Sequence, residues 1–235
     1  MFGPKSFQGG FAKLLASLFC LFAAIQLCIA APHTGQLSIR DEHQLYARIT
    51  TDKIADYKNK FDAAEQVPQD DESFMDFTTA GNHKIGSSGF AGCVGIVLAT
   101  RQGAIVGHYG QTGENVNRAK ENIGKLYRDN NDKVGGATPY VYVAVDYESN
   151  EVKNSDIVDQ HKDFLRELTG QDPVEQTYTE ALETYDLDEY MEGNFDEDMI
   201  SGGFVVENAG GGSADTNLIF IDVEDIATSI QPNRR

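Results

Sequence analysis

Cys93 and His108 are the two residues of this 235-residue chain whose types and spacing most directly suggest chemistry. They lie fifteen positions apart in the small and apolar stretch GFAGCVGIVLATRQGAIVGHYG, residues 89–110. A free thiol has a pKa of about 8.5, which a neighbouring imidazole lowers by forming a thiolate–imidazolium pair. Such a pair can attack an acyl carbon and return the proton to the leaving group. The alternative is an inert, buried cysteine and histidine with a packing role only.

The stretch predicts a β-hairpin, because two apolar, β-rich runs flank the turn sequence Arg-Gln-Gly at 101–103. If the first two turn residues form the loop, paired positions sum to 203 and His108 faces Gly95. Cys93 then shares the face of His108, since side chains alternate along a strand, and is its diagonal neighbour at roughly 7–8 Å. A three-residue loop would put His108 on the opposite face. The dyad hypothesis therefore depends on the hairpin register.

Neighbouring residues supply candidates for the supporting roles of such a site. Gly92 permits a close backbone approach before the nucleophile, and nearby backbone N–H groups could form an oxyanion hole. Ser87, Ser88 or a backbone carbonyl could orient the imidazole. Gly95, which has no side chain, leaves the imidazole room.

The N-terminus has the pattern of a secretory signal peptide, residues 1–31. Lys5 and Lys13 give a positive start, and an uncharged apolar run follows at 14–30 before a small-residue cleavage site. The alternative is a retained signal anchor, but the run is short for the roughly 20 residues that span a bilayer. We therefore expect a secreted, extracellular protein that has no membrane attachment after cleavage.

Signal cleavage would leave a single cysteine. Cys20 and Cys28 lie inside the signal, so Cys93 alone remains and no internal disulfide can form. A lone thiol in a protein exported to an oxidising compartment indicates an intermolecular bond or a thiol kept for its reactivity.

The formal net charge is −18 and is unevenly distributed. Residues 1–166 carry 20 acids and 17 bases, whereas residues 167–233 carry 17 acids and no base. A field of this sign repels phosphate backbones, so nucleic acid is not an expected partner. A solvated acidic surface, or a cationic protein as substrate or partner, agrees with the charge. The oligomeric state has no signal in the sequence.

The elements that would position the pair predict an α+β, layered fold. After a polar leader at 32–85, partly helical or flexible, we expect one domain at 86–235 with an acidic insertion at 180–200. Two amphipathic helices should flank mixed or antiparallel β-sheets that form a sandwich-like core. Beyond the hairpin, the expected helices are 114–130 and 155–170, and the expected strands are 138–147, 174–179, 202–210 and 216–225. Ser155 is the expected N-cap of the second helix and Gly170 its end.

The quoted motifs resemble a known enzyme fold. AGCVGIVL followed by GAIVGHYG is similar to the Cys–His deamidase fold of the bacterial chemoreceptor glutamine deamidase and of the catalytic domain of cytotoxic necrotizing factor toxins. In that fold a Gly-rich turn precedes the cysteine, and a later strand carries a small-His-aromatic sequence, here residues 107–109. The chain also resembles secreted fungal proteins of unassigned function. The resemblance covers roughly residues 86–225.

The resemblance implies that Cys93 is the nucleophile and His108 the base in deamidation, or transamidation, of protein glutamine side chains. It implies no cofactor, and the sequence has no pattern of metal ligands. The alternative function is a non-catalytic secreted effector or binding protein that acts through its acidic surface on the same fold.

Overall fold

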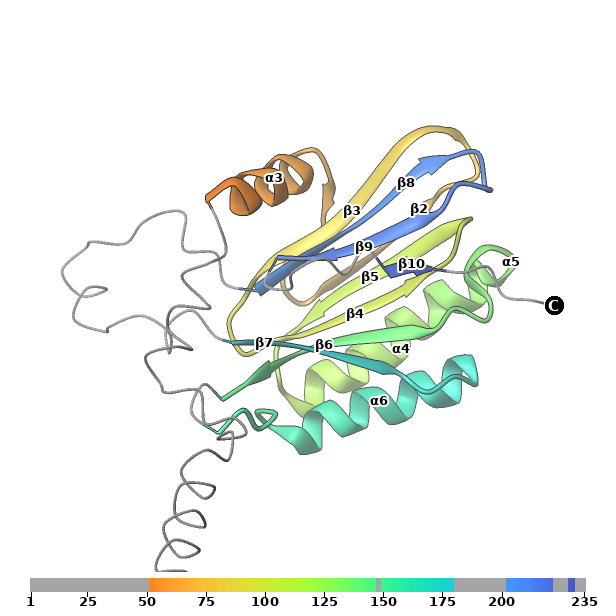
Figure 1. The fold of residues 1–235 in the computed structure, drawn as a ribbon. Helices are drawn as coiled ribbons and strands as arrows, with labels where there is room; N and C mark the ends of the chain where they lie inside the picture. The colour runs from red at the N-terminus through yellow and green to blue at the C-terminus, as the bar shows by residue number, and fades with distance from the viewer. Residues whose placement is uncertain (1–50, 147–148, 180–201, 222–227, 231–235) are drawn as a thin grey trace, which may run out of the picture. The chain divides into compact units, whose positions relative to one another are not determined.

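Two five-stranded β-sheets and three longer helices form the part of the chain that this computed structural model describes: residues 51–146, 149–179, 202–221 and 228–230 (Figure 1). All of them belong to one unit, residues 49–235. The signal peptide predicted at 1–31 and the acidic insertion predicted at 180–200 lie outside the described residues. Within the described residues, no helix combines the length and the apolar character needed to cross a bilayer.

The first sheet has the strand order β1-β3-β8-β9-β10 and the second the order β2-β5-β4-β6-β7. Neighbouring strands are antiparallel except for the parallel pairs β1–β3 and β6–β7. The strands are β1 (Glu65–Gln66), β2 (Asp71–Asp76), β3 (Ala80–Phe90), β4 (Val94–Ala99), β5 (Gly103–Tyr109), β6 (Pro139–Val145), β7 (Val174–Thr179), β8 (Gly202–Gly210), β9 (Thr216–Phe220) and β10 (Thr228–Ile230). The helices are α3 (Thr51–Asp62), α4 (Gly113–Asp129), α5 (Asn131–Val134) and α6 (Ser155–Thr169). The predicted α+β fold is confirmed.

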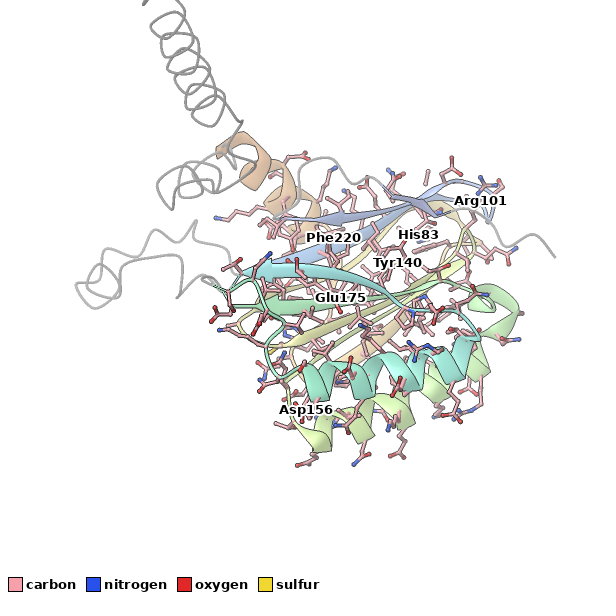
Figure 2. All side chains as sticks on the ribbon, turned by 60° about the horizontal axis from the view of Figure 1, so that its bottom comes forward. His83, Arg101, Tyr140, Asp156, Glu175 and Phe220 are labelled. Carbon is pink, nitrogen blue, oxygen red and sulfur yellow. The ribbon has the colours of Figure 1, made fainter. Side chains whose placement is uncertain are left out.

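Both faces of the second sheet are buried, each in its own apolar layer. One face packs against the first sheet, with Val97, Val106 and Phe204 among the buried residues between them. Tyr140 and Phe220 also point into this layer (Figure 2). The other face packs against α4 and α6, through residues such as Ile96 and Ile123. This double burial explains why β4 and β5 are buried at every position and, apart from His108 and Tyr109, carry no polar side chains.

The hairpin register is the one that the dyad hypothesis requires. Gly95 pairs with His108 and Ala99 with Ala104, and the Thr100 N–H donates to the Gly103 carbonyl at 2.9 Å, so the loop has two residues. Hence His108 and Gly95 face the first sheet, and Cys93 is part of the same buried layer. The predicted register is therefore confirmed, and that Cys93 and His108 act as a pair stays a prediction.

The two flanking helices begin and end as local sequence directs. Thr112 caps α4, its side chain accepting from the Asn115 N–H at 3.2 Å. Gly170 ends α6 in the left-handed conformation, as predicted. The predicted N-cap Ser155 is wrong by one residue: Asn154 is the cap, in the left-handed region that Asn tolerates, and Ser155 is the first helical residue.

The segment predicted as a polar leader contributes strands to both sheets. β2 pairs with β5, β1 pairs with β3, and β3 begins at Ala80. A partly helical or flexible leader to residue 85 therefore does not describe these strands. The physical reason is that β2 is an edge strand whose side chains are mostly half-buried, so it tolerates acidic residues. These acids hid the alternating pattern by which a strand is predicted.

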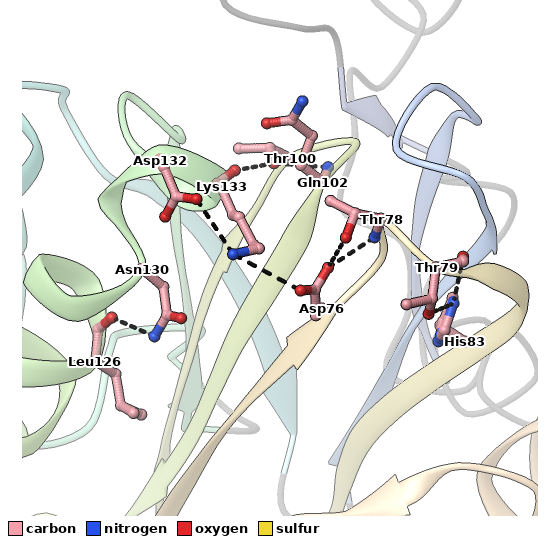
Figure 3. Close-up of polar contacts among 10 residues, drawn as sticks. All are labelled: Asp76, Thr78, Thr79, His83, Thr100, Gln102, Leu126, Asn130, Asp132 and Lys133. Carbon is pink, nitrogen blue, oxygen red and sulfur yellow. Dashed lines mark hydrogen bonds and ion pairs between the residues drawn. The ribbon is translucent and has the colours of Figure 1, made fainter.

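A polar cluster ties down the end of the hairpin that carries its turn (Figure 3). The Thr78 N–H and hydroxyl both donate to Asp76, at 2.8 and 2.6 Å. Lys133 of α5 forms ion pairs with Asp76 and Asp132, at 3.7 and 3.2 Å. The Thr100 hydroxyl donates to the Lys133 carbonyl at 2.5 Å. These contacts fix the turn end, while Cys93 and His108 lie toward the other end of the hairpin.

Candidate functional site

Cys93 immediately precedes β4 and lies in the layer between the two sheets. It is 6 % exposed, and His108 of β5 is 1 % exposed. The Tyr178 hydroxyl donates to the Cys93 carbonyl at 2.8 Å, which ties the cysteine backbone to β7. The fold therefore holds a thiol and an imidazole on one face of one sheet, both removed from solvent.

Ser87 holds the imidazole in a defined orientation. Its Oγ atom lies 2.8 Å from Nδ1 of His108 and donates to the Val67 carbonyl at 2.7 Å. The hydroxyl has one proton, and the carbonyl can only accept, so His108 must donate from Nδ1. Nε2 then carries the lone pair, and this atom is buried without a hydrogen-bond partner among the described residues. An imidazole in this tautomer has the free acceptor that a general base needs.

Burial keeps His108 neutral. Loss of solvent is the main cause and lowers its pKa to about 4, while the charge of Asp70 partly opposes this shift. Asp70 is fixed beside the strand end, because its N–H donates to the His108 carbonyl at 2.7 Å and its Oδ1 accepts from Asn115 at 2.9 Å. In this structure the imidazole is therefore an uncharged acceptor and gives little support to a thiolate.

Phe90 covers the imidazole. The two rings stack with centroids 3.8 Å apart and planes inclined by 14°. The predicted room above Gly95 is also occupied, because a methyl group there would meet Phe204 at 2.7 Å and Phe90 at 3.0 Å. The expectation that Gly95 leaves space for the imidazole is therefore wrong: this space holds two phenyl rings.

The two other predicted supporting residues lie differently. Ser88 pairs with Gly203, one position away from the Ser87–Phe204 pair, so its side chain is on the opposite face of the first sheet. It is not brought to His108. Gly92 lies in the turn before Cys93 with φ of 80°, a backbone conformation that glycine adopts without strain.

Sequence reasoning missed Phe90 and Tyr178, which both contact the site. The glycines on either side of Phe90 were the available sequence signal, because glycine often marks an irregular strand position. In the structure Gly89, like Gly92, has a positive φ, of 79°. Tyr178 gave no local signal, since it reaches Cys93 from 85 residues away through the parallel β6–β7 pairing. Tyr109, the aromatic of the quoted motif, faces the helices instead and donates to Glu72 at 2.6 Å.

Replacing Ser87 by Ala should destabilise the fold by about 1–3 kcal/mol, because it leaves the Nδ1–H of His108 buried and unpaired. Ser88→Ala is the matched control, an adjacent serine on the other face, and should change stability by less than about 0.5 kcal/mol. Urea unfolding followed by far-UV circular dichroism measures both. Equal effects of the two substitutions would contradict the assigned hydrogen bond.

A separate groove of about 740 Å³ lies between α4 and α6, on the helix side of the second sheet. Its lining mixes charged and apolar side chains: Lys120, Tyr127, Arg128, Asn131, Asp163, Phe164, Glu167 and Leu168. Cys93 and His108 face the other side of that sheet. Among the described residues, no three His, Cys, Asp or Glu side chains gather as a metal ion would require.

No protein-family model matches this chain, and no curated protein matches it either. What the chain does must therefore be inferred from its side chains and their geometry.

Proposed function

We propose that the chain is a secreted, cysteine-dependent hydrolase of side-chain carboxamides, with protein glutamine as its substrate. Cys93 is the nucleophile, His108 the base and Ser87 the group that orients the base. One observation supports this proposal: His108 lies in the same buried layer as Cys93, with Nδ1 engaged by Ser87 and with Nε2 left as an acceptor that no described residue occupies.

In the proposed reaction the Cys93 proton moves to Nε2 of His108 as sulfur attacks the carboxamide carbon. The tetrahedral intermediate collapses when the imidazolium returns this proton to the departing nitrogen, which releases ammonia and leaves a thioester. Water, deprotonated by His108, then attacks the thioester and gives the side-chain carboxylate and the free thiol. If an amine replaces water, the product is a substituted amide, so transamidation follows from the same intermediate.

A second candidate function has an observation in its favour. Ser87, Cys93 and His108 are all buried, and burial lowers the pKa of His108 rather than raising it. This is also the environment of a packed, inert pair. The second candidate is therefore a non-catalytic binding protein on the same fold, whose net charge of −18 suits a cationic partner.

The pH dependence of Cys93 alkylation separates the two candidates. Iodoacetamide labelling of the native protein, followed by the mass of the peptide that carries Cys93, depends on the thiolate fraction whenever the thiol is reached. For the enzyme we expect a midpoint at least about one unit below 8.5, and a return to about 8.5 in His108→Ala. A midpoint of 8.5 or higher that His108→Ala leaves unchanged would favour the binding protein and overturn the proposal.

A further inference from the structure

Phe90 reaches the site because β3 contains a bulge. Ser88 pairs with Gly203 and Phe90 pairs with Gly202, so two residues of β3 advance while β8 advances by one. Gly89 is the extra residue, with φ of 79°. In a regular strand, residues 88 and 90 would share a face, and Phe90 would point away from His108. The bulge instead directs the ring inward, as bulges beside functional sites often do.

The Phe90 ring fills the volume that a substrate would need. It is fully buried and stacks on the imidazole, and it closes the space over Gly95, the strand partner of His108, two residues after Cys93. Tyr142, Tyr178 and Phe204 surround it, with ring centroids 5.3, 5.9 and 5.5 Å away. An acyl group that reaches both Cys93 and His108 must enter this volume.

The segment that carries Phe90 is flanked by two glycines. Gly89 and Gly92 bracket Phe90 and Ala91, and both glycines occupy the left-handed region. A side chain added at Gly89 would meet no atom within 4 Å, so this hinge lies in open space. A hinge needs only a few residues that can undergo large changes in φ and ψ, and two glycines meet this requirement.

We infer that the Phe90 ring occupies the acyl-binding slot of the proposed enzyme and must leave it, by rotation about Gly89 and Gly92, before a substrate binds. This inference rests on the proposed function. The slot is bounded by the imidazole face, by Gly95 and by Phe204. Because the slot accommodates a flat ring, it selects a planar, unbranched group such as a carboxamide. Phe90 thus determines which substrates enter the slot and when the slot is open, and it is not a catalytic residue.

Displacement of the ring would also change the chemistry of the pair. With the ring in place, solvent is excluded and His108 is held neutral. Water or a polar carboxamide in its place reduces the penalty on the charged imidazole. The open form is therefore the form in which a thiolate–imidazolium pair is stable.

The test compares the rate of Cys93 alkylation in wild type, Phe90→Ala and Phe90→Leu at neutral pH, on the full chain. Only the open fraction reacts, so we expect Phe90→Ala to be labelled at least about ten times faster than wild type, with Phe90→Leu between them. Phe77→Ala is the matched control: Phe77 is another fully buried phenylalanine of the same layer. Its N–H donates to the Gln102 carbonyl, at the turn end of the hairpin.

Equal acceleration by Phe77→Ala, at equal loss of stability, would mean that labelling occurs through general unfolding and would overturn the inference. Unchanged labelling in both Phe90 variants would overturn it as well. The midpoint of the pH profile tests the proposed function separately. Fast labelling of Phe90→Ala with a midpoint near 8.5 would support Phe90 as the cover of the site and reject the enzyme. Fast labelling of wild type with a low midpoint would support the enzyme and reject Phe90 as a cover.

Discussion

Acidification from about pH 7.5 to about pH 5 is expected to lower the free energy of unfolding by about 4 kcal/mol through two buried histidines. His108 and His161 are 1 % and 0 % exposed, and burial lowers the pKa of each to about 4. The charge of Lys120 lowers the pKa of His161 further, whereas that of Asp70 opposes the shift of His108.

The sign follows from the direction of these shifts. An unfolded histidine titrates near 6.5, so between about 6.5 and 4 the unfolded chain binds more protons than the folded chain. The stabilisation is complete above the unfolded pKa and is lost as the pH falls toward the folded pKa. At about pH 5 each histidine has lost about 2 kcal/mol. Asp76, whose pKa is lowered mainly by hydrogen bonds from Thr78 (Figure 3), stays ionised in this range.

His161→Leu provides the internal control. Both ring nitrogens of His161 are buried and have no hydrogen-bond partner within the part of the chain that the structure describes, and the ring lies between Tyr109 and Phe164. Leucine should therefore stabilise the protein at neutral pH by about 1–3 kcal/mol, since it removes unsatisfied polar atoms. It should also halve the dependence of stability on pH. Urea midpoints at the two pH values measure both effects, and an unchanged pH slope in His161→Leu would refute this account.

The parts of the fold that could be read from the sequence are those with strong local periodicity. The amphipathic helix at 114–130 and the two-residue loop of the β4–β5 hairpin were predicted because both depend on residues that are close in the sequence. Val116, Ala119 and Ile123 are buried residues of this helix, α4. The register then placed Cys93 and His108 on one face without any long-range information.

The rest of the site depends on contacts that no local pattern encodes. Ser87 was a candidate by position, but only the β3 strand of the opposite sheet brings it to Nδ1 of His108. Phe90 covers the imidazole because a bulge reverses its direction, and the period of two on which strand predictions depend does not anticipate a bulge. Tyr178 is placed beside Cys93 because β7 pairs in parallel with β6. The contacts that orient, cover and anchor the pair thus come from three residues that lie far apart in the sequence or are turned by a bulge.

Helix α3 illustrates the same limit for the leader. Its Tyr57 is 3 % exposed and stacks with Phe61, and its hydroxyl donates to the Ser87 carbonyl at 3.4 Å. The space for this tyrosine exists because residue 203 is glycine, where an added methyl group would collide with the Tyr57 hydroxyl. The leader was predicted to be partly helical, but no local pattern indicated that Tyr57 packs against a strand as distant in the sequence as β8, which carries Gly203.

Tyr57→Ala should therefore destabilise the whole domain by about 3–5 kcal/mol, the usual cost of emptying a buried aromatic site. Tyr57→Phe removes only a long hydrogen bond and should cost less than about 1.5 kcal/mol. A leader that merely rests on the domain would instead show no effect of Tyr57→Ala on the urea midpoint.

Gly203→Ala tests the same contact from the sheet side. Alone, it must displace the tyrosine and should destabilise the fold. In the Tyr57→Ala background its methyl group enters the space left by the ring, so the double variant should be more stable than the sum of the single effects predicts, by about 0.5–3 kcal/mol. Strict additivity would mean that Tyr57 does not occupy the gap at Gly203. The outcome also bears on the site, because the strand that Tyr57 covers carries Ser87 on its inner face, so loosening α3 should be transmitted to the imidazole of His108.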